Sequence, residues 1–102
     1  MPGDKQVDLA AVIAAVDHPT RRRIIAVLRD GEHHVSALAR LLEVSRPVLH
    51  VHLSKLEHAG LVATRIELGS DGKALRRCAV IRFDVRLTPE TIAATLEEPS
   101  ND

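Results

Sequence analysis

Three side chains able to bind an anion, Arg46, His50 and Lys55, lie along one stretch of the sequence that has the marks of a complete helix. Ser45 precedes the stretch and can cap it, because its hydroxyl accepts a hydrogen bond from a free N–H of the first turn. Gly60 follows the stretch and can adopt the left-handed conformation in which many helices end. We therefore predict one helix between Ser45 and Gly60 that carries a weakly basic surface.

The apolar side chains of this stretch determine which face of the helix points outward. Leu49, Leu53 and Leu56 recur at helical spacing and form a single apolar stripe. Pointing away from this stripe are Pro47, Val51, Ser54, Lys55 and His58, flanked by Val48, His50 and His52. Short polar and apolar side chains suit a helix that lies in the major groove of DNA, where they meet base edges.

We assign candidate DNA contacts to the start of this helix, to its outward face and to a basic turn further along the chain. Arg46 can contact a guanine or a phosphate through two parallel hydrogen bonds. Val48 and Val51 can meet thymine methyl groups, and His50 can reach a base edge. The candidates are Ser45, Arg46, Pro47, Val48, His50, Val51, Lys55, Lys73, Arg76 and Arg77. A solvated or capping role is the alternative for each of them.

The same stretch resembles the recognition helix of winged helix-turn-helix repressors of the ArsR type. The residues that carry the likeness are Leu49, His52-Leu53, Leu56 and Ala59-Gly60-Leu61-Val62. Two upstream segments also fit the family pattern: Pro19-Thr20-Arg21 before the second helix, and Leu38-Ala39 with Leu42 and Val44-Ser45 before the recognition helix. The resemblance covers about residues 8 to 97. It implies a winged helix-turn-helix fold and DNA binding, and it does not indicate which signal is sensed.

The periodicity of the chain predicts one domain over residues 1–102, mainly α-helical with a small β-hairpin wing. We expect helices over residues 7–16, 20–29, 37–42 and 89–97, a loop at 32–34, and strands over 63–68 and 74–83. Ser36 is expected to cap the third helix and Thr88 the last one, which begins with Pro89. Residues 36–58 then form the helix-turn-helix and residues 63–83 the wing.

The first predicted helix is apolar on nearly every side, whereas a surface helix of a monomer keeps a polar face. A chain of 102 residues has little material with which to bury such a helix. We therefore predict a homodimer formed through the first and last helices, residues 7–16 and 89–97. The candidate interface residues are Leu9, Val12, Ile13, Val16, Ile92 and Leu96.

The formal net charge of zero argues against a general polyanion binder, but the charges are unevenly distributed. Residues 18–82 contain twelve basic and six acidic residues, a net charge of +6, and the two ends together carry −6. A basic centre with acidic ends suits DNA contact by the centre, and a mixed solvated surface is the alternative. Because Arg21, Arg22 and Arg23 lie at a helix start, where the dipole disfavours cations, we expect an acid or a phosphate to hold at least one of them.

Metal and cofactor chemistry find little support in the sequence. Many members of the ArsR-type family that the sequence resembles hold a metal through a Cys-x-Cys pair. His34 and Ser36 occupy the matching positions in this chain. The six histidines are not at metal-ligand spacing, so we predict no metal and no cofactor. No nucleophile–base pattern or phosphate-binding glycine loop is present, so we predict no enzymatic activity. Cys78 is expected to be buried and inert.

With no signal peptide and no apolar run of about 20 residues, the sequence predicts a cytoplasmic protein without a membrane segment. The sequence and the resemblance together predict a homodimeric regulator of transcription, a repressor by the resemblance, that binds a pseudo-palindromic site in double-stranded DNA. Two alternatives stay open. One is a metal- or ligand-responsive repressor of the same fold. The other is a winged-helix protein-interaction or architectural module without sequence-specific DNA binding.

Overall fold

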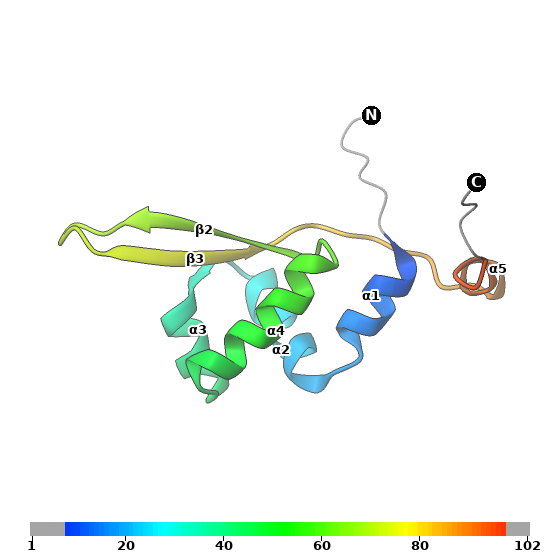
Figure 1. Ribbon diagram of the computed structural model, residues 1–102, viewed down its shortest axis with the longest axis horizontal. Coiled ribbons are helices and arrows are strands. Elements are labelled where there is room, and N and C mark those ends of the chain that lie inside the picture. Colours follow the sequence, from blue (N-terminus) through cyan, green and yellow to red (C-terminus); the bar gives the residue numbers. More distant parts are fainter. Residues whose placement is uncertain (1–7, 98–102) are drawn as a thin grey trace.

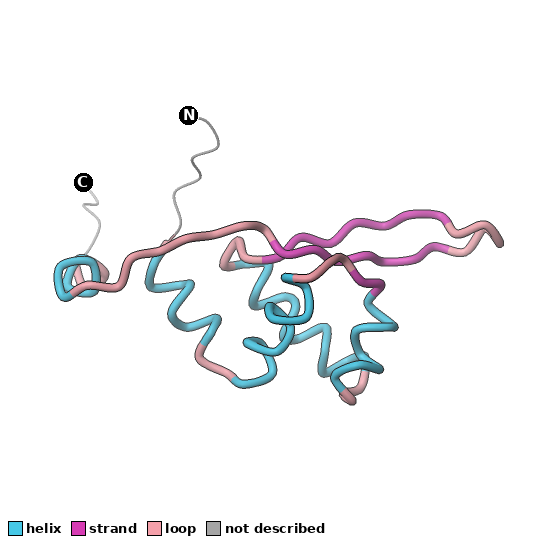
Figure 2. The backbone as a smooth tube through the Cα atoms, turned by 180° about the vertical axis from the view of Figure 1, so that it is seen from behind, coloured by secondary structure: helices cyan, strands magenta, loops and turns pink. Residues whose placement is uncertain are grey.

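The computed structural model describes residues 8–97. Its helices are α1 (Leu9–Val16), α2 (Pro19–Arg29), α3 (Val35–Leu42), α4 (Arg46–His58) and α5 (Pro89–Ala94), and its strands are β1 (His33–His34), β2 (Val62–Leu68) and β3 (Ala74–Val80). Helices α1 to α4 form a body from which the β2–β3 hairpin extends on one side (Figure 1). A segment without helix or strand follows β3, runs past α1 and leads to α5 on the other side (Figure 2). The predicted winged helix-turn-helix architecture is confirmed.

The hydrophobic core is built from aliphatic side chains of α2, α3, α4 and the base of the hairpin. Its most deeply buried members are Ile24, Leu28, Leu38, Leu49, Leu53, Leu56, Leu61, Val62 and Cys78. The predicted stripe of α4 is confirmed, because all three of its leucines belong to this set. Burial of this stripe fixes the rotation of α4 and so determines which of its side chains face solvent.

Both ends of α4 form where the local sequence predicts them. The Ser45 hydroxyl accepts a hydrogen bond from the Val48 N–H at 3.3 Å. At the other end Gly60 has a φ of +80°, and the next residue, Leu61, donates its N–H to the Leu56 carbonyl at 2.9 Å. A left-handed glycine at this place is a common helix terminator.

The loop predicted at residues 32–34 is wrong, because His33 and His34 form the short strand β1. His33 pairs with Cys78 and His34 with Arg77, which gives a three-stranded antiparallel sheet of order β1-β3-β2. The helix that follows therefore begins at Val35, two residues before the predicted start. Ser36 lies inside its first turn and does not cap it, and His34 occupies the cap position without a side-chain hydrogen bond.

Other boundaries also differ from the prediction. Strand β3 ends at Val80, because β2 begins at its partner Val62 and no residue of β2 remains to pair with positions 81–83. Helix α5 starts after the predicted Thr88 cap but ends at Ala94, so Leu96 lies beyond it. Helix α1 starts at Leu9, because the Asp8 carboxylate accepts the N–H groups of the first turn. Residue 7, the predicted start of that helix, lies outside the described residues.

Candidate nucleic-acid interface

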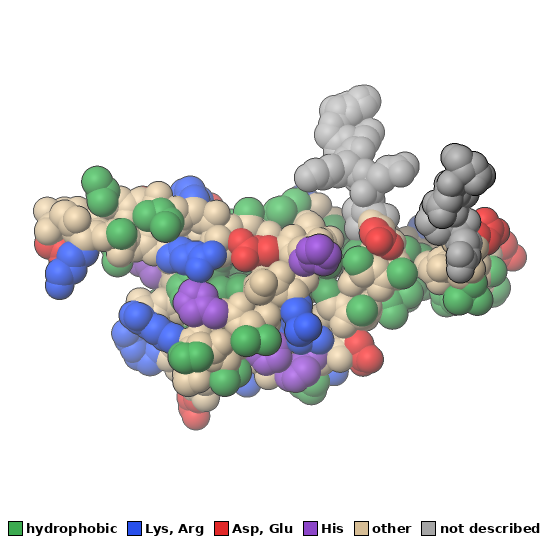
Figure 3. All heavy atoms as spheres, viewed as in Figure 1, with side chains coloured by type: hydrophobic (Ala, Val, Ile, Leu, Met, Phe, Trp, Pro, Cys, Tyr) green, Lys and Arg blue, Asp and Glu red, His purple; other side chains and the backbone are tan. Residues whose placement is uncertain are grey.

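The candidate contacts on the recognition helix, α4, lie on its solvent side. They are Ser45, Arg46, Pro47, Val48, His50, Val51 and Lys55, all of them exposed. Val48 is 46% exposed and Val51 56%, although both are apolar. Figure 3 shows Lys, Arg and His side chains gathered over α4 and the base of the hairpin on this side of the molecule. The helix therefore presents a mixed basic and apolar face, which is the composition that base edges and thymine methyl groups require.

Arg76 ties the wing to the recognition helix. Its Nη2 donates to the Thr64 hydroxyl at 3.1 Å, and its Nη1 lies 3.4 Å from Nδ1 of His50 on α4. Thr64 in turn donates to Glu57 on α4 at 2.8 Å, and the carboxylate of Glu57 lies 4.0 Å from Nη2 of Arg76. These contacts hold the angle between hairpin and helix. The sequence identified Arg76 and His50 as separate candidates and missed Thr64 and Glu57, the residues that join them.

A cleft of about 160 Å³ opens between the start of α4, the start of α3 and the wing. Arg46, His50 and Arg76 line it on one side, together with Ser36 and His34 from the start of α3. No acidic side chain lines this cleft. Three of the predicted DNA contacts thus meet at one basic concavity, whose chemistry is complementary to a phosphate group.

Arg77 is the predicted contact that lies apart from the others. Side chains alternate between the two faces of a strand, so Arg77 points away from the face that carries Arg76. Its Nε donates to Glu67 at 3.1 Å, and its Nη1 lies 3.7 Å from the carboxylate of Glu32. The hydrogen bond from Arg77, followed by that from His34, lowers the pKa of Glu67. The positive charge of Arg77 is thus paired with carboxylates on the face of the strand opposite Arg76, and its assignment as a DNA contact stays a prediction.

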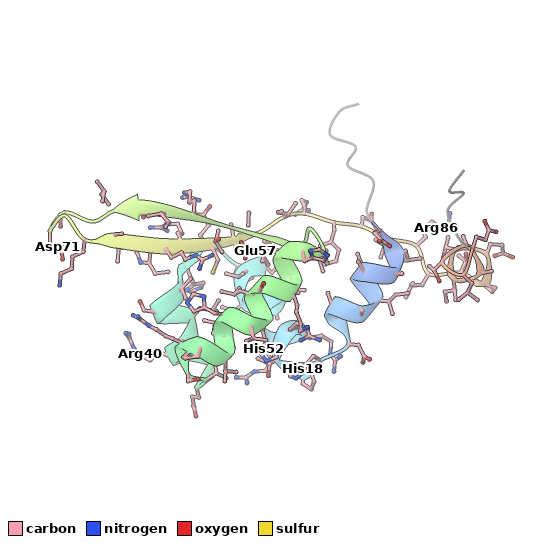
Figure 4. All side chains as sticks on the ribbon, in the orientation of Figure 1. His18, Arg40, His52, Glu57, Asp71 and Arg86 are labelled. Carbon is pink, nitrogen blue, oxygen red and sulfur yellow. The ribbon has the colours of Figure 1, made fainter. Side chains whose placement is uncertain are left out.

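Lys73 lies at the tip of the wing, in the turn between β2 and β3 near Asp71 (Figure 4). The Asp71 carboxylate accepts the Lys73 N–H at 3.0 Å, and the Lys73 carbonyl accepts the Gly69 N–H at 2.8 Å. Gly72 has a φ of +83°, which a turn of this shape requires. The turn predicted from Gly69 to Lys73 is confirmed, and the exposed Lys73 side chain stands at the end of the hairpin farthest from the body.

Behind α4, a buried arginine joins the recognition helix to α1. Arg21 is only 9% exposed; its Nε donates to the Ala15 carbonyl at 2.7 Å, and its Nη1 lies 3.1 Å from Nδ1 of His52. The neighbouring Arg22 donates to the Val16 carbonyl at 2.8 Å. Among residues 8–97 no acidic side chain pairs with this arginine run, so the expected acid is not found there, and a phosphate stays a prediction. The free carbonyls at the C-terminal end of α1 carry partial negative charge and bind the two guanidinium groups.

His52 is kept neutral by its surroundings. Its Nδ1 must accept the proton of Arg21, so the imidazole proton lies on Nε2. Partial burial lowers the pKa of His52, and electrostatic interactions with the nearby His18, Arg21 and Lys55 lower it further. The ring centroids of His18 and His52 lie 4.5 Å apart. Figure 4 labels these two neighbouring residues. His52 therefore acts in packing behind the helix and not as an outward base contact.

Acidification should destabilise the fold through His52. Because folding lowers the pKa of this side chain below its ordinary value of 6.5, the unfolded chain takes up a proton at a higher pH than the folded chain. At a pH well above 6.5, His52 does not change the free energy of unfolding. As the pH falls below 6.5, protonation of the unfolded chain lowers the free energy of unfolding. We expect urea unfolding between about pH 7.5 and about pH 5.5 to show a steeper loss of stability in the native chain than in His52→Asn. Asparagine can still accept from Arg21 but does not titrate, so equal pH profiles would contradict this role of His52.

Cys78 is fully buried, as expected, with its thiol 3.5 Å from the His33 carbonyl. Burial raises the pKa of this thiol to about 11, so the reactive thiolate is scarce near neutral pH. Within residues 8–97, no three His, Cys, Asp or Glu side chains are grouped as a metal site. The described part of the chain also contains no helix with the length and apolar character needed to cross a membrane.

An apolar surface lies at the opposite end of the molecule from the wing. Ile13 is 38% exposed, Ile92 47% and Leu96 79%, and no residue of α5 is buried among the described residues. Val12, by contrast, is 3% exposed and packs in its own core, because the inward face of α1 covers α2 and α4. Val12 is therefore corrected from a candidate interface residue to a core residue. Leu9 and Val16 are partly exposed.

Comparison with known proteins agrees with this geometry. Residues 16–65 match a helix-turn-helix domain family. A helix-turn-helix-type transcriptional regulator of Methanocaldococcus jannaschii, itself uncharacterised, is 35% identical over 80 residues, which cover 78% of this chain and 84% of that protein.

Solved structures agree as well. A crystal structure of an ArsR family transcriptional regulator has 28% identity and a TM-score of 0.63, and the likeness covers 85% of this chain and 82% of that one. A homodimeric winged helix-turn-helix DNA-binding domain from Mycobacterium bovis, a possible ArsR-family regulator, has 25% identity and a TM-score of 0.63 over 72% of this chain and 63% of that one. The family match over residues 16–65 spans α2, α3 and α4. The chain belongs to the helix-turn-helix transcriptional regulators of the ArsR type.

Proposed function

We propose that the chain represses transcription by binding a specific double-stranded DNA site, with α4 in the major groove and the wing along the adjacent backbone. The observation that carries this proposal is the meeting of Arg46, His50 and Arg76 at one basic concavity beside the exposed face of α4. In this arrangement Arg46, Val48 and Val51 read bases, while Lys55, Arg76 and Lys73 bind phosphates. Ser45 and Pro47 position the first turn.

We further propose that the DNA-binding form is a homodimer joined through α1 and α5. Helix α5 has only six residues and buries none of them within the described chain, and a helix this short is unstable in water without packing partners. A second copy would cover Leu9, Ile13, Val16, Ile92 and Leu96. The Mycobacterium bovis domain of similar fold is homodimeric. Two recognition helices would then enter successive major grooves about 34 Å apart, which calls for a pseudo-palindromic site.

The proposal is tested by binding of the purified protein to the DNA upstream of its own gene, compared with a scrambled duplex at two salt concentrations. Preference for the upstream duplex, with an affinity that falls steeply with salt, is the expected result. Equal, salt-sensitive binding to both duplexes would favour an architectural role. Negligible binding to either at low salt would favour the protein-interaction alternative. Repression is tested separately by a reporter placed behind the bound site, whose expression should rise when the gene is deleted.

Loss of the charge at the wing tip should weaken specific and non-specific DNA binding alike. Lys73→Ala removes one phosphate contact per protomer, so the slope of log affinity against log salt should become shallower by about 1 per protomer. Fluorescence anisotropy over a salt series measures this slope. Arg82→Ala is the matched control, because Arg82 is exposed near Ile25 and Phe83, on a surface that α4 does not line. An unchanged slope in Lys73→Ala would remove the wing tip from the interface.

A further inference from the structure

A groove of about 530 Å³ separates α1 from α4. Its lining residues are Ala11, Ala14 and Ala15 on α1, Ser54, Lys55 and His58 on α4, Ala59 directly after α4, and Arg21 from the start of α2. Figure 3 shows basic and histidine side chains gathered where α4 faces α1. The groove combines a wall of methyl groups with a cluster of cationic groups, and its volume falls in the range of about 300–1,000 Å³ usual for small-molecule sites.

The positive charge in this groove has no acidic counterpart. None of the lining residues is an Asp or Glu. The ion pairs formed among residues 8–97 involve neither Arg21 nor Lys55 nor His58. Gathering cations beside a buried guanidinium without a carboxylate is electrostatically unfavourable, and an anion bound between them would relieve this cost.

Arg21 turns part of its guanidinium toward the groove. Its Nε and Nη1 are occupied by the Ala15 carbonyl and by His52, whereas Nη2 forms no hydrogen bond within residues 8–97. The described residues contain no buried side-chain nitrogen or oxygen that lacks a partner. Nη2 is therefore solvent-accessible, and Arg21 is one of the residues that line the groove. A side chain that is 9% exposed thus presents two free N–H donors at a fixed place.

We propose that the groove between α1 and α4 binds a small amphiphilic carboxylate, whose charged group contacts Arg21 and Lys55 and whose hydrocarbon chain lies along the alanine wall. A carboxylate matches the geometry of a guanidinium edge, and charge-assisted hydrogen bonds of this kind are the strong ones. The methyl groups of Ala11, Ala14 and Ala59 offer an apolar surface that a DNA phosphate would not use. Binding of an amphiphilic small molecule accounts for both the apolar wall and the cationic side chains of the groove.

The bound carboxylate would lower DNA affinity, a consequence that rests on the proposed function. Arg21 holds His52 of α4 to the end of α1, so an anion that engages its guanidinium acts on the contact between these helices. Lys55 cannot neutralise a DNA phosphate while it pairs with the ligand. The site therefore links a small-molecule signal to the recognition helix without a metal.

The test uses octanoate as the probe and octan-1-ol, which has the same chain length without the charge, as the matched control. Both are titrated into ¹⁵N-labelled protein at constant ionic strength. Octanoate should shift the backbone amide signals of Ala11, Ala14 and Ser54. It should bind at least about tenfold more tightly than octan-1-ol, because a charge-assisted hydrogen bond contributes about 1.5–3 kcal/mol, and 1.4 kcal/mol corresponds to tenfold in affinity.

Two variants locate the site. Lys55→Gln should weaken octanoate binding about tenfold, whereas Arg82→Gln, which makes the same charge change outside the groove, should leave it unchanged. Ala14→Leu places a larger side chain into the groove at an exposed helix position and should abolish the shifts while the protein stays folded. Shifts confined to α5 and Ile13, equal binding of the two probes, unaltered binding by Ala14→Leu, or no binding would each overturn the proposal.

A DNA-binding measurement with octanoate distinguishes failure of this proposal from failure of the proposed function. Octanoate at a saturating concentration should reduce affinity for the preferred duplex about tenfold in the native chain and not in Ala14→Leu. If octanoate shifts the amide signals but the protein binds no duplex, the proposed function is contradicted and the carboxylate site is still supported. Octanoate shifts with DNA affinity unaltered would overturn the coupling between the groove and the recognition helix.

Discussion

Leu53→Ala should lower the free energy of unfolding by about 3–5 kcal/mol, the range found when a large aliphatic side chain is removed from a well-packed core. Leu53 is 1% exposed and lies in the middle of the buried stripe of α4, between Leu49 and Leu56. A small domain has a total stability of about 5–15 kcal/mol, so this substitution removes a large fraction of it. Urea unfolding followed by circular dichroism measures the loss.

Val51→Ala is the matched control for this experiment, because Val51 belongs to the same helix and is 56% exposed. Truncation of an exposed side chain changes stability by about 0.5 kcal/mol or less. Val51→Ala should therefore unfold at nearly the native midpoint while it weakens DNA binding. Equal destabilisation by the two substitutions would mean that α4 is rotated relative to its described orientation.

Arg46→Ala should reduce affinity for the specific DNA site by about 10- to 100-fold, because a bidentate contact between arginine and guanine contributes about 1–3 kcal/mol of discrimination. Arg46 is exposed at the first position of α4, and recognition helices contact base edges with their N-terminal residues. Affinity for a scrambled duplex should fall much less. Fluorescence anisotropy with both duplexes at one salt concentration measures the two losses side by side.

Arg46→Lys separates a base contact from a phosphate contact. Lysine keeps the positive charge but cannot form the two parallel hydrogen bonds of a guanidinium. We expect Arg46→Lys to restore binding to the scrambled duplex and to leave binding to the specific duplex weakened. If Arg46→Ala lowers both affinities equally and Arg46→Lys restores both, Arg46 contacts a phosphate and the specificity resides in Val48, His50 or Val51.

The helix-turn-helix and the wing could be predicted from sequence because their signals are local. Ser45 caps the helix that it precedes, and Gly60 ends it, through hydrogen bonds that span three to five residues. The outward face of α4 follows from the spacing of Leu49, Leu53 and Leu56, which allows one buried orientation. The turn from Gly69 to Lys73 likewise depends on residues within it. The apolar residues of the first and last predicted helices also indicated that α1 and α5 leave apolar surface uncovered.

The outcomes that only the tertiary structure decided all involve residues distant in sequence. Arg21 binds His52 across 31 positions, and Arg77 meets His34 across 43, so neither partner could be inferred from neighbouring residues. The pairing of His33 and His34 with β3 turned an expected loop into a strand and moved the start of α3.

Tertiary packing also decided which side chains lie on the surface and which face of each element they occupy. Strand alternation places Arg76 on the face of the hairpin beside α4 and Arg77 on the opposite face, beside the carboxylates of Glu67 and Glu32. Val12 lies on the face of α1 that packs against the core, so it is buried. The sequence by itself determined the order of the helices, the caps of α4 and α5, the turn of the wing and the family, because hydrogen bonds and side-chain periodicity within one element are set by adjacent residues. The tertiary structure alone decided which cations of residues 8–97 are held by partners within the fold, because the partner of a charged side chain depends on how the elements pack together.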